Sequence, residues 1–446
     1  MSGCVIYNFL GPAKGSGRGP LDPLVRVSSS EASLPLSPCF PPMSSLPDRK
    51  RSRLSPPARA LAASLAQFFV AATWRAMNPA SRQNFTEAPA PKPLARLYYE
   101  TPDGWTAPLF HLAPCPGGAG EPVILAHALG MSPDVFRYGS GATLAESLSE
   151  RGFNVYLFTH RGDRNALQPQ SSTALQTTNS LQPQSALQPQ SIDIEDDPLG
   201  PMLQPQSRGY DFDDIVAHDV PAALERATRH SGFRRAHWIG HGLGGQLGLA
   251  WAAWSGADQL ATVTALCAAV QFDQPRTEVR AMSKALSMLP AHWHLPSRAT
   301  ARLASPWLDE PGDVPPERLR GVMNHAVADL PVGLVQQLRR WMKSGTLCDK
   351  DGWYDYVEGL ADAQVPLLIG AAGQDLSCLP HQATPALEAW GGADKTSLPM
   401  PPSWGHLDPL LAEDADKYVF RPLTAWLDAR RKLSWERDGE RIRRSA

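Results

Sequence analysis

The chain has 446 residues, of which 43% are apolar, which is enough for a sizeable hydrophobic core and exceeds the length of one small domain. Its 42 basic and 44 acidic residues give a formal net charge of -2, which excludes nucleic acid or an anionic membrane as a general partner. The six cysteines form neither a CxxC pair nor a metal-binding spacing, so we expect reduced thiols, a cytoplasmic location and no cofactor.

Residues 1–93 are predicted to form a disordered N-terminal extension, because residues 1 to about 58 are rich in Pro, Ser and Gly. The short apolar run at 60–72 follows a basic stretch, and we interpret it as an amphipathic helix. A signal peptide, with translation starting at Met43, is the alternative. No run reaches the roughly 20 apolar residues of a membrane span, so no integral membrane segment is expected.

The first part of a folded core is predicted at 94–272. A hairpin is expected at 95–114, where two strand-like runs flank a Pro-Asp-Gly turn. The continuous apolar run PVILAHALG at 122–130 predicts a strand buried on both faces. A helical pattern at 143–152 and a second buried strand at 153–163 follow. The order strand, helix, strand predicts a parallel sheet.

The sequence LQPQS occurs four times between residues 165 and 207. Each copy holds too little apolar surface to bury, and its prolines disfavour both helix and sheet. We therefore predict a disordered low-complexity insertion in one loop at 165–207. A Pro-rich docking segment for a protein partner is the alternative interpretation.

The core resumes after the insertion with a helix at 209–232, followed by a strand, a turn, a second helix and another buried strand. Residues 273–355 have a helical pattern and are predicted to form a cap. The second part of the core is expected at 356–431, and a solvated basic tail at 432–446. Large apolar side chains of the cap suit the roof of an apolar pocket, although plain core packing explains them equally well. They are Met282, Met288, Trp293, Leu295, Trp307 and Trp341.

The stretch AHWIGHGLGGQLGLAW at 236–251 contains the frame of a nucleophile elbow, the sharp strand-to-helix turn written G-x-S-x-G. Here the frame reads G-H-G-L-G, so Gly242 stands at the third position, where a serine is expected. Two further residues follow in the order of a catalytic triad, acid and then histidine. We predict that Asp375 ends a buried strand, VPLLIGAAGQD, and that His406 lies in WGHLD before the last helix.

Together these residues resemble the α/β-hydrolase superfamily, and within it the lipase and esterase branch with acid-lipase-like sequences. The segment DFDDIVAHDVPAAL at 211–224 is similar to the acidic, Phe-containing segment and the Asp-x-Pro-Ala that precede the elbow in that branch. The resemblance covers about residues 94–430, apart from the insertion. It implies an α/β fold, with a mostly parallel sheet, helices on both faces and a helical cap inserted at 273–355.

The stretch AHAL at 126–129 resembles the family's oxyanion loop but has Ala128 where Gly is usual. By that match the backbone N–H groups of Leu129 and Leu243 are expected to bind an oxyanion. Gly242 departs from the family, because it has no Cβ and therefore no side-chain atom that could attack a carbonyl. The elbow residue is expected at positive φ, where a non-Gly residue costs about 1–2 kcal/mol, so glycine suits the position.

Four histidines and one cysteine near these motifs could each have a structural role or a catalytic or metal-binding role. The structural role is favoured for each. His241 is expected to point beside the site rather than to replace the missing catalyst, and His127 to make a structural hydrogen bond. Cys267 is expected to pack in the core rather than to act as a nucleophile. His292 and His294 have a spacing usable for a metal, but no third ligand is evident nearby. We therefore expect no metal site.

These observations leave three functional hypotheses. The first is a pseudo-hydrolase that binds a small apolar or acyl-ester ligand in the inherited pocket. The second is an active ester hydrolase in which His406, oriented by Asp375, activates a water beside Gly242. The third is an interaction protein whose LQPQS loop binds a partner. The retained Asp375 and His406 favour the enzyme, because a site without function would be free to lose them.

Overall fold

Most of the chain from residue 94 onward is described by a computed structural model. The predicted extension at 1–93, Trp307 and the end of the basic tail lie outside the described residues, as does most of the predicted insertion at 165–207. Two short pieces of that insertion are described, and both form β contacts: Leu167 bridges to another strand, and Gln204–Pro205 pairs with the cap. The described residues are 94–138, 143–163, 166–167, 204–205 and 209–434, apart from 258, 274, 276, 298 and 302–311.

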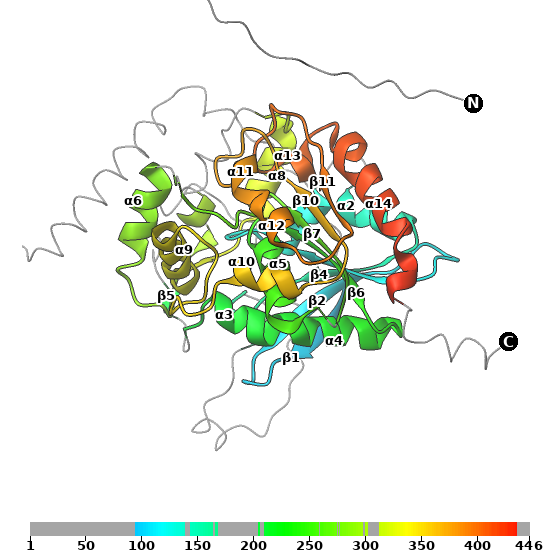
Figure 1. Ribbon diagram of the computed structural model, residues 1–446, viewed down its shortest axis with the longest axis horizontal. Coiled ribbons are helices and arrows are strands. Elements are labelled where there is room, and N and C mark those ends of the chain that lie inside the picture. Colours follow the sequence, from blue (N-terminus) through cyan, green and yellow to red (C-terminus); the bar gives the residue numbers. More distant parts are fainter. Residues whose placement is uncertain are drawn as a thin grey trace, which may run out of the picture. The chain divides into compact units, whose positions relative to one another are not determined.

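The core is an eight-stranded sheet (Figure 1). The second strand runs antiparallel to both of its neighbours, and every other pair is parallel. The predicted α/β fold with a mostly parallel sheet is thereby confirmed. In spatial order the strands are β1 (Ala95–Glu100), β2 (Thr106–Leu112), β4 (Asn154–Phe158), β3 (Pro122–Ala126), β6 (Ala236–His241), β7 (Leu260–Leu266), β10 (Leu367–Gly370) and β11 (Lys395–Leu398).

The central strands are buried on both faces because they lack polar alternation. Strand β3 reads PVILA, and every one of its residues is buried. Ile124 and Ala126 pack into the hydrophobic cluster on one side of the sheet, whereas Val123 and Leu125 pack into the cluster on the other. The sheet therefore separates two apolar layers, and helices must cover both.

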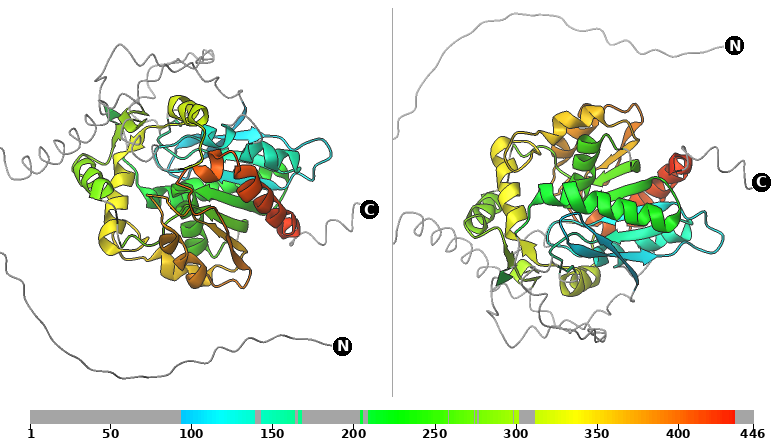
Figure 2. Two further views of the ribbon diagram at one scale, coloured as in Figure 1. Left: turned by 90° about the horizontal axis from the view of Figure 1, so that it is seen from above. Right: turned by 90° about the horizontal axis from the view of Figure 1, so that it is seen from below.

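Helices cover both faces of the sheet. Helices α4 (Val220–Ser231) and α5 (Leu243–Ser255) contribute to one apolar layer, and α2 (Leu144–Glu150) and α14 (Arg421–Asp428) contribute to the other. Figure 2 shows the red α14 beside the cyan α2, which it contacts. The shorter elements are η2 (Pro133–Arg137), α3 (Phe212–Asp214), η3 (Ile215–Asp219), α10 (Tyr356–Gly359), η4 (Leu360–Asp362), α11 (Pro380–Ala383), α12 (Pro385–Ala389), α13 (Asp408–Leu411), η5 (Asp416–Phe420) and η6 (Arg431–Ser434).

In the described part of residues 273–355, where a helical cap is expected, the structure has the helices α6, α8 and α9 and two short strands that the sequence pattern does not indicate. The strands β8 and β9 pair with each other, and β8 also pairs with β5 (Gln204–Pro205). Helices α6 and α9 lie side by side at the left of Figure 1. The elements are α6 (Thr277–Leu286), β8 (Trp293–Leu295), α8 (Pro316–His325), β9 (Leu330–Pro331) and α9 (Val332–Ser344).

Of the large apolar residues of the cap, some pack in the core and others lie near the site, whereas Met288 is exposed. Trp341 is buried against the rings of Phe212 and Phe272, so it packs in the core. Leu295 belongs instead to a small apolar cluster that includes Leu129, next to the predicted oxyanion loop. The backbones of the cap and the loop are also joined, since the N–H of Ala328 donates to the carbonyl of Gly130 over 2.9 Å. None of the helices in the described part of the chain is long and apolar enough to cross a membrane.

Candidate functional site

The candidate site is centred on the turn between β6 and α5. Gly242 occupies this turn with φ 53° and ψ -118°, a conformation that strains any residue with a side chain. The neighbouring glycines allow strand and helix to approach closely. A Cβ on Gly240 would lie 2.1 Å from the carbonyl carbon of Gly244, and a Cβ on Gly244 would lie 2.0 Å from the carbonyl oxygen of Ala126. The spacing G-H-G-L-G is therefore required by the geometry of the turn.

An Asp–His pair lies beside this turn. Nδ1 of His406 donates a hydrogen bond to Oδ2 of Asp375 over 2.7 Å. Asp375 is fully buried, and its Oδ1 accepts from the backbone N–H groups of Ser377, at 2.7 Å, and Cys378, at 3.0 Å. These bonds hold the carboxylate in place, and the carboxylate in turn orients the imidazole.

The prediction that Asp375 ends a strand is wrong. Strand β10 ends at Gly370, and Asp375 lies in the loop that follows. The chain leaves the sheet there and pairs with the loop that carries His406, since the N–H of Gln374 donates to the carbonyl of Trp404 over 2.8 Å. This pairing brings the two loops together and places the carboxylate within reach of the imidazole.

The imidazole of His406 faces the position where Gly242 lacks a side chain. A Cβ built on Gly242 would lie 3.3 Å from Nε2 of His406 and 2.9 Å from the Cβ of Ala128. The predicted oxyanion loop, the elbow and the Asp–His pair therefore converge on one point. A side-chain oxygen at residue 242 would be within hydrogen-bond reach of this imidazole, but glycine supplies none.

The two predicted oxyanion donors lie on either side of this point. Leu243 is the first residue of α5, so its N–H has no acceptor within the helix. Leu129 follows Ala128 in the loop after β3. Among the described residues, neither N–H group donates to another group of the protein. Gly244 donates to the carbonyl of His127 over 3.0 Å, which holds the loop against the start of the helix.

His241 and His127 have the hydrogen bonds of structural residues. Nε2 of His241 donates to the backbone carbonyl of His406 over 2.9 Å, and Nδ1 of His127 lies 3.0 Å from the carbonyl of Ala128. Burial, together with the neighbouring His406, lowers the pKa of His241 to about 3. His241 is therefore neutral at physiological pH, and its side chain supports the loop of His406 by a hydrogen bond to the backbone carbonyl of that residue.

Four polar rings connect the oxyanion loop to the cap, and sequence reasoning did not group them. The ring centroids of His127 and His160 are 5.4 Å apart, those of His160 and Tyr210 6.2 Å, and those of Tyr210 and His294 5.6 Å. His160 follows strand β4, so the rule that functional side chains follow strand ends could have found it. Burial, together with the neighbouring His160, lowers the pKa of His294 to about 4.

This geometry combines a strand–glycine turn–helix with an Asp–His pair beyond the carboxyl ends of a parallel sheet, which defines a protein of the α/β-hydrolase class. The sequence profile described as "Alpha/beta hydrolase family" matches residues 123–421. The chain therefore belongs to the α/β hydrolase family. No curated protein sequence gives a significant match.

Solved structures similar to this chain include several esterases. An esterase from Thermogutta terrifontis is 15% identical, with a TM-score of 0.48, covering 76% of this chain and 99% of that one. An esterase from Exiguobacterium antarcticum is 14% identical, with a TM-score of 0.48, covering 74% and 98%. An enol-lactonase from Burkholderia xenovorans is 16% identical, with a TM-score of 0.44, covering 72% and 96%. At these identities the likeness concerns the fold alone.

Proposed function

We propose that this protein is a hydrolase-fold binding protein, in which glycine replaces the nucleophile serine and the inherited site holds a small acyl or apolar ligand. The observation that carries the proposal is the position of Gly242. Its backbone occupies the elbow conformation beside His406, yet it offers no atom that could form an acyl-enzyme. The N–H groups of Leu129 and Leu243 have no acceptor within the described protein and would bind the ligand's carbonyl oxygen.

The apolar part of such a ligand would lie against the cap. Leu129 contributes both its N–H and a partly buried side chain, which packs against the cap residues Leu295, Leu330 and Val335. An acyl chain bound through its carbonyl would thus meet apolar side chains immediately beyond the oxyanion donors. Because these side chains are apolar, they favour a ligand with a small apolar tail over a sugar or a nucleotide.

A single proline substitution, at Leu243, tests the proposal. Proline is tolerated at the first position of a helix, so Leu243→Pro removes the N–H of α5 with little other change. Leu243→Ala is the matched control, since it truncates the same side chain but keeps the N–H. The probe is a ketone isosteric with a medium-chain ester, which presents a carbonyl but cannot be hydrolysed, and its Kd is measured by calorimetry.

We expect the ketone to bind Leu243→Pro about tenfold more weakly than Leu243→Ala, which corresponds to about 1.4 kcal/mol for one hydrogen bond. Equal binding by the two variants would show that the N–H takes no part in recognition. Absence of ketone binding by the native chain would refute the binding proposal as a whole.

A second candidate function is ester hydrolysis without a covalent intermediate. The specific observation in its favour is that Nε2 of His406 faces the space beside Gly242, where a water could be activated by the Asp375-oriented imidazole. Turnover of short and long acyl esters by the native protein, lost in His406→Ala, would establish this candidate in place of the binding protein. Turnover that persists in His406→Ala would exclude it.

A further inference from the structure

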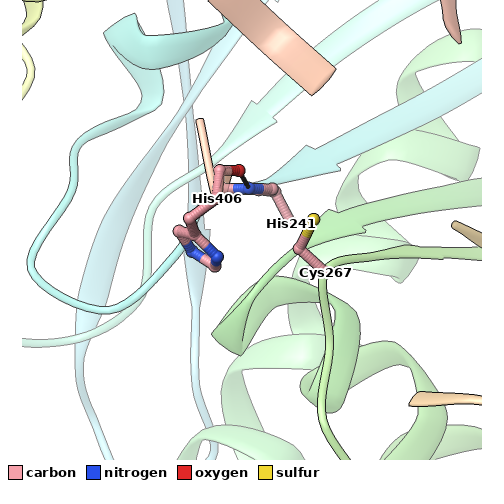
Figure 3. Close-up of side chains that lie close together, drawn as sticks. All are labelled: His241, Cys267 and His406. Carbon is pink, nitrogen blue, oxygen red and sulfur yellow. Dashed lines mark hydrogen bonds between the residues drawn. The ribbon is translucent and has the colours of Figure 1, made fainter. Parts of the chain in front are cut away.

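Three potential metal ligands lie close together next to the elbow, namely His241, Cys267 and His406 (Figure 3). Each offers a ligand atom, and the three atoms lie within 4.8 Å of one another. They come from the end of β6, from the residue after β7 and from the loop before α13. Sequence spacing could not group them, because two of them lie at the ends of neighbouring strands and the third lies in a loop that pairs with the loop of Asp375.

Both histidines are oriented through one ring nitrogen, as metal-binding histidines are. A carbonyl oxygen can only accept a hydrogen bond, so Nε2 of His241 carries the proton that it donates to the carbonyl of His406. In the neutral ring Nδ1 is then a lone-pair donor. Nδ1 of His406 is held by the carboxylate of Asp375, the arrangement in which a carboxylate supports a metal-bound imidazole.

The remaining nitrogen of His241 has no satisfactory role in the protein alone. Its Nδ1 is buried and has no hydrogen-bond partner within the described residues. A buried polar atom without a partner costs about 1–3 kcal/mol, so such atoms are rare and need an explanation. A metal ion would satisfy this lone pair directly.

Cys267 is held in place at a cost to the backbone. Its φ is 52°, in the left-handed region that a residue with a side chain rarely adopts, and its N–H donates to the carbonyl of Gly370 over 2.7 Å. This backbone conformation fixes the sulfur of Cys267 beside the two imidazoles, where it can serve as a metal ligand.

We propose that His241, Cys267 and His406 bind a thiophilic divalent metal ion, of which Zn²⁺ and Cd²⁺ are representative. The ion bonds to the Cys267 sulfur, and the thiol proton is released to solvent. One thiolate and the Asp375 carboxylate then balance the two charges of the ion, which a buried site requires. Ligand atoms in a tetrahedral zinc site are about 3.5 Å apart, so the side chains close in by about 1 Å.

Cadmium titration followed by ultraviolet absorption tests the site, because a cadmium–thiolate bond gives a charge-transfer band that nitrogen and oxygen ligands do not give. The native chain is expected to develop this band with one equivalent of Cd²⁺ and to lose it on excess Zn²⁺. Cys267→Ser, which keeps the size of the side chain, should lack the band. Cys348→Ala is the matched control, because Cys348 is also a buried free cysteine but lies outside the cluster.

Zinc affinity, measured by competition with a chromophoric chelator, is expected to fall at least 100-fold in Cys267→Ser and in His241→Gln but to stay unchanged in Cys348→Ala. Circular dichroism confirms that each variant folds. A band that persists in Cys267→Ser, or zinc affinity that is equal in the native chain and His241→Gln, overturns the proposal. The measurement needs neither a ligand nor turnover, so its failure leaves the proposed function untouched.

Discussion

Restoring a serine at the elbow is the most direct perturbation of the proposed degenerate site. In Gly242→Ser the new Cβ lies 3.3 Å from Nε2 of His406, so the hydroxyl can reach the imidazole within hydrogen-bond distance. The same Cβ lies 2.9 Å from the Cβ of Ala128, which is closer than two such carbons approach in real structures. The single variant therefore gains a nucleophile and a steric conflict together.

The structure gives the size of each effect. The positive φ of 53° costs a residue with a Cβ about 1–2 kcal/mol, and the contact with Ala128 adds about 1–3 kcal/mol of overpacking. Ala128→Gly removes the second cost but not the first. We therefore expect the double variant Gly242→Ser with Ala128→Gly to have a free energy of unfolding about 1–2 kcal/mol lower than that of the native chain. The single variant Gly242→Ser should be less stable than the double variant.

The assay is hydrolysis of short and medium acyl esters, together with urea unfolding of each variant. The double variant Gly242→Ser with Ala128→Gly should exceed the native chain by about two orders of magnitude or more, because a covalent route is opened. Adding His406→Ala should abolish the gain. A double variant that folds normally but stays inert on every ester would refute the claim that the rest of the triad is in place.

Two further outcomes follow from the same groups. A fluorophosphonate should not label the native chain, because Gly242 offers no oxygen; stoichiometric labelling of any serine that disappears in His406→Ala would place the nucleophile elsewhere. Burial lowers the pKa of His127 and His237 to about 3 and that of His294 to about 4. The unfolded chain therefore binds more protons than the folded chain below about pH 6.5. The free energy of unfolding should decrease as the pH is lowered, by about 2 kcal/mol per histidine at pH 5. A urea midpoint that is unchanged between pH 7 and pH 5 would contradict this.

The order of the core elements was predictable because its physical causes are local. The side chains of a continuous apolar run such as PVILA are all buried only when helices cover both faces of the sheet. The glycines of the elbow are needed where strand and helix touch. Strand β11 gave no such pattern. It reads KTSL, and its first three residues are exposed, so only pairing with β10 makes it a strand. The two short strands of the cap are likewise defined by partners distant in sequence.

The site was predictable in its membership but not in its geometry. The order of elbow, acid and histidine is a property of the chain, whereas the place of Asp375 depends on how its loop pairs with the loop of His406. The cluster of His241, Cys267 and His406 shows the same limit. The sequence suggests core packing for Cys267, a place beside the site for His241 and a triad role for His406, and only the folded structure brings their three ligand atoms close together.

The retention of Asp375 has a structural cause that does not depend on catalysis. Its buried carboxylate accepts from two backbone N–H groups and from His406, and it thereby shapes the loop that follows β10. Losing it would leave buried donors unpaired, which costs about 1–3 kcal/mol each. Substitution of Asp375 would thus destabilise the fold even in a chain that no longer hydrolyses any substrate. The presence of Asp375 is therefore not evidence of activity.

This structural account makes its own prediction. Asp375→Ala should lower the free energy of unfolding by about 3 kcal/mol or more, whether or not the native protein turns over any ester. Asp414→Ala is a suitable control, since this carboxylate is exposed on the surface before η5. Equilibrium urea unfolding measures both. A loss below about 1 kcal/mol in Asp375→Ala would mean that the carboxylate is dispensable for folding, and its retention beside His406 would then point to hydrolysis after all.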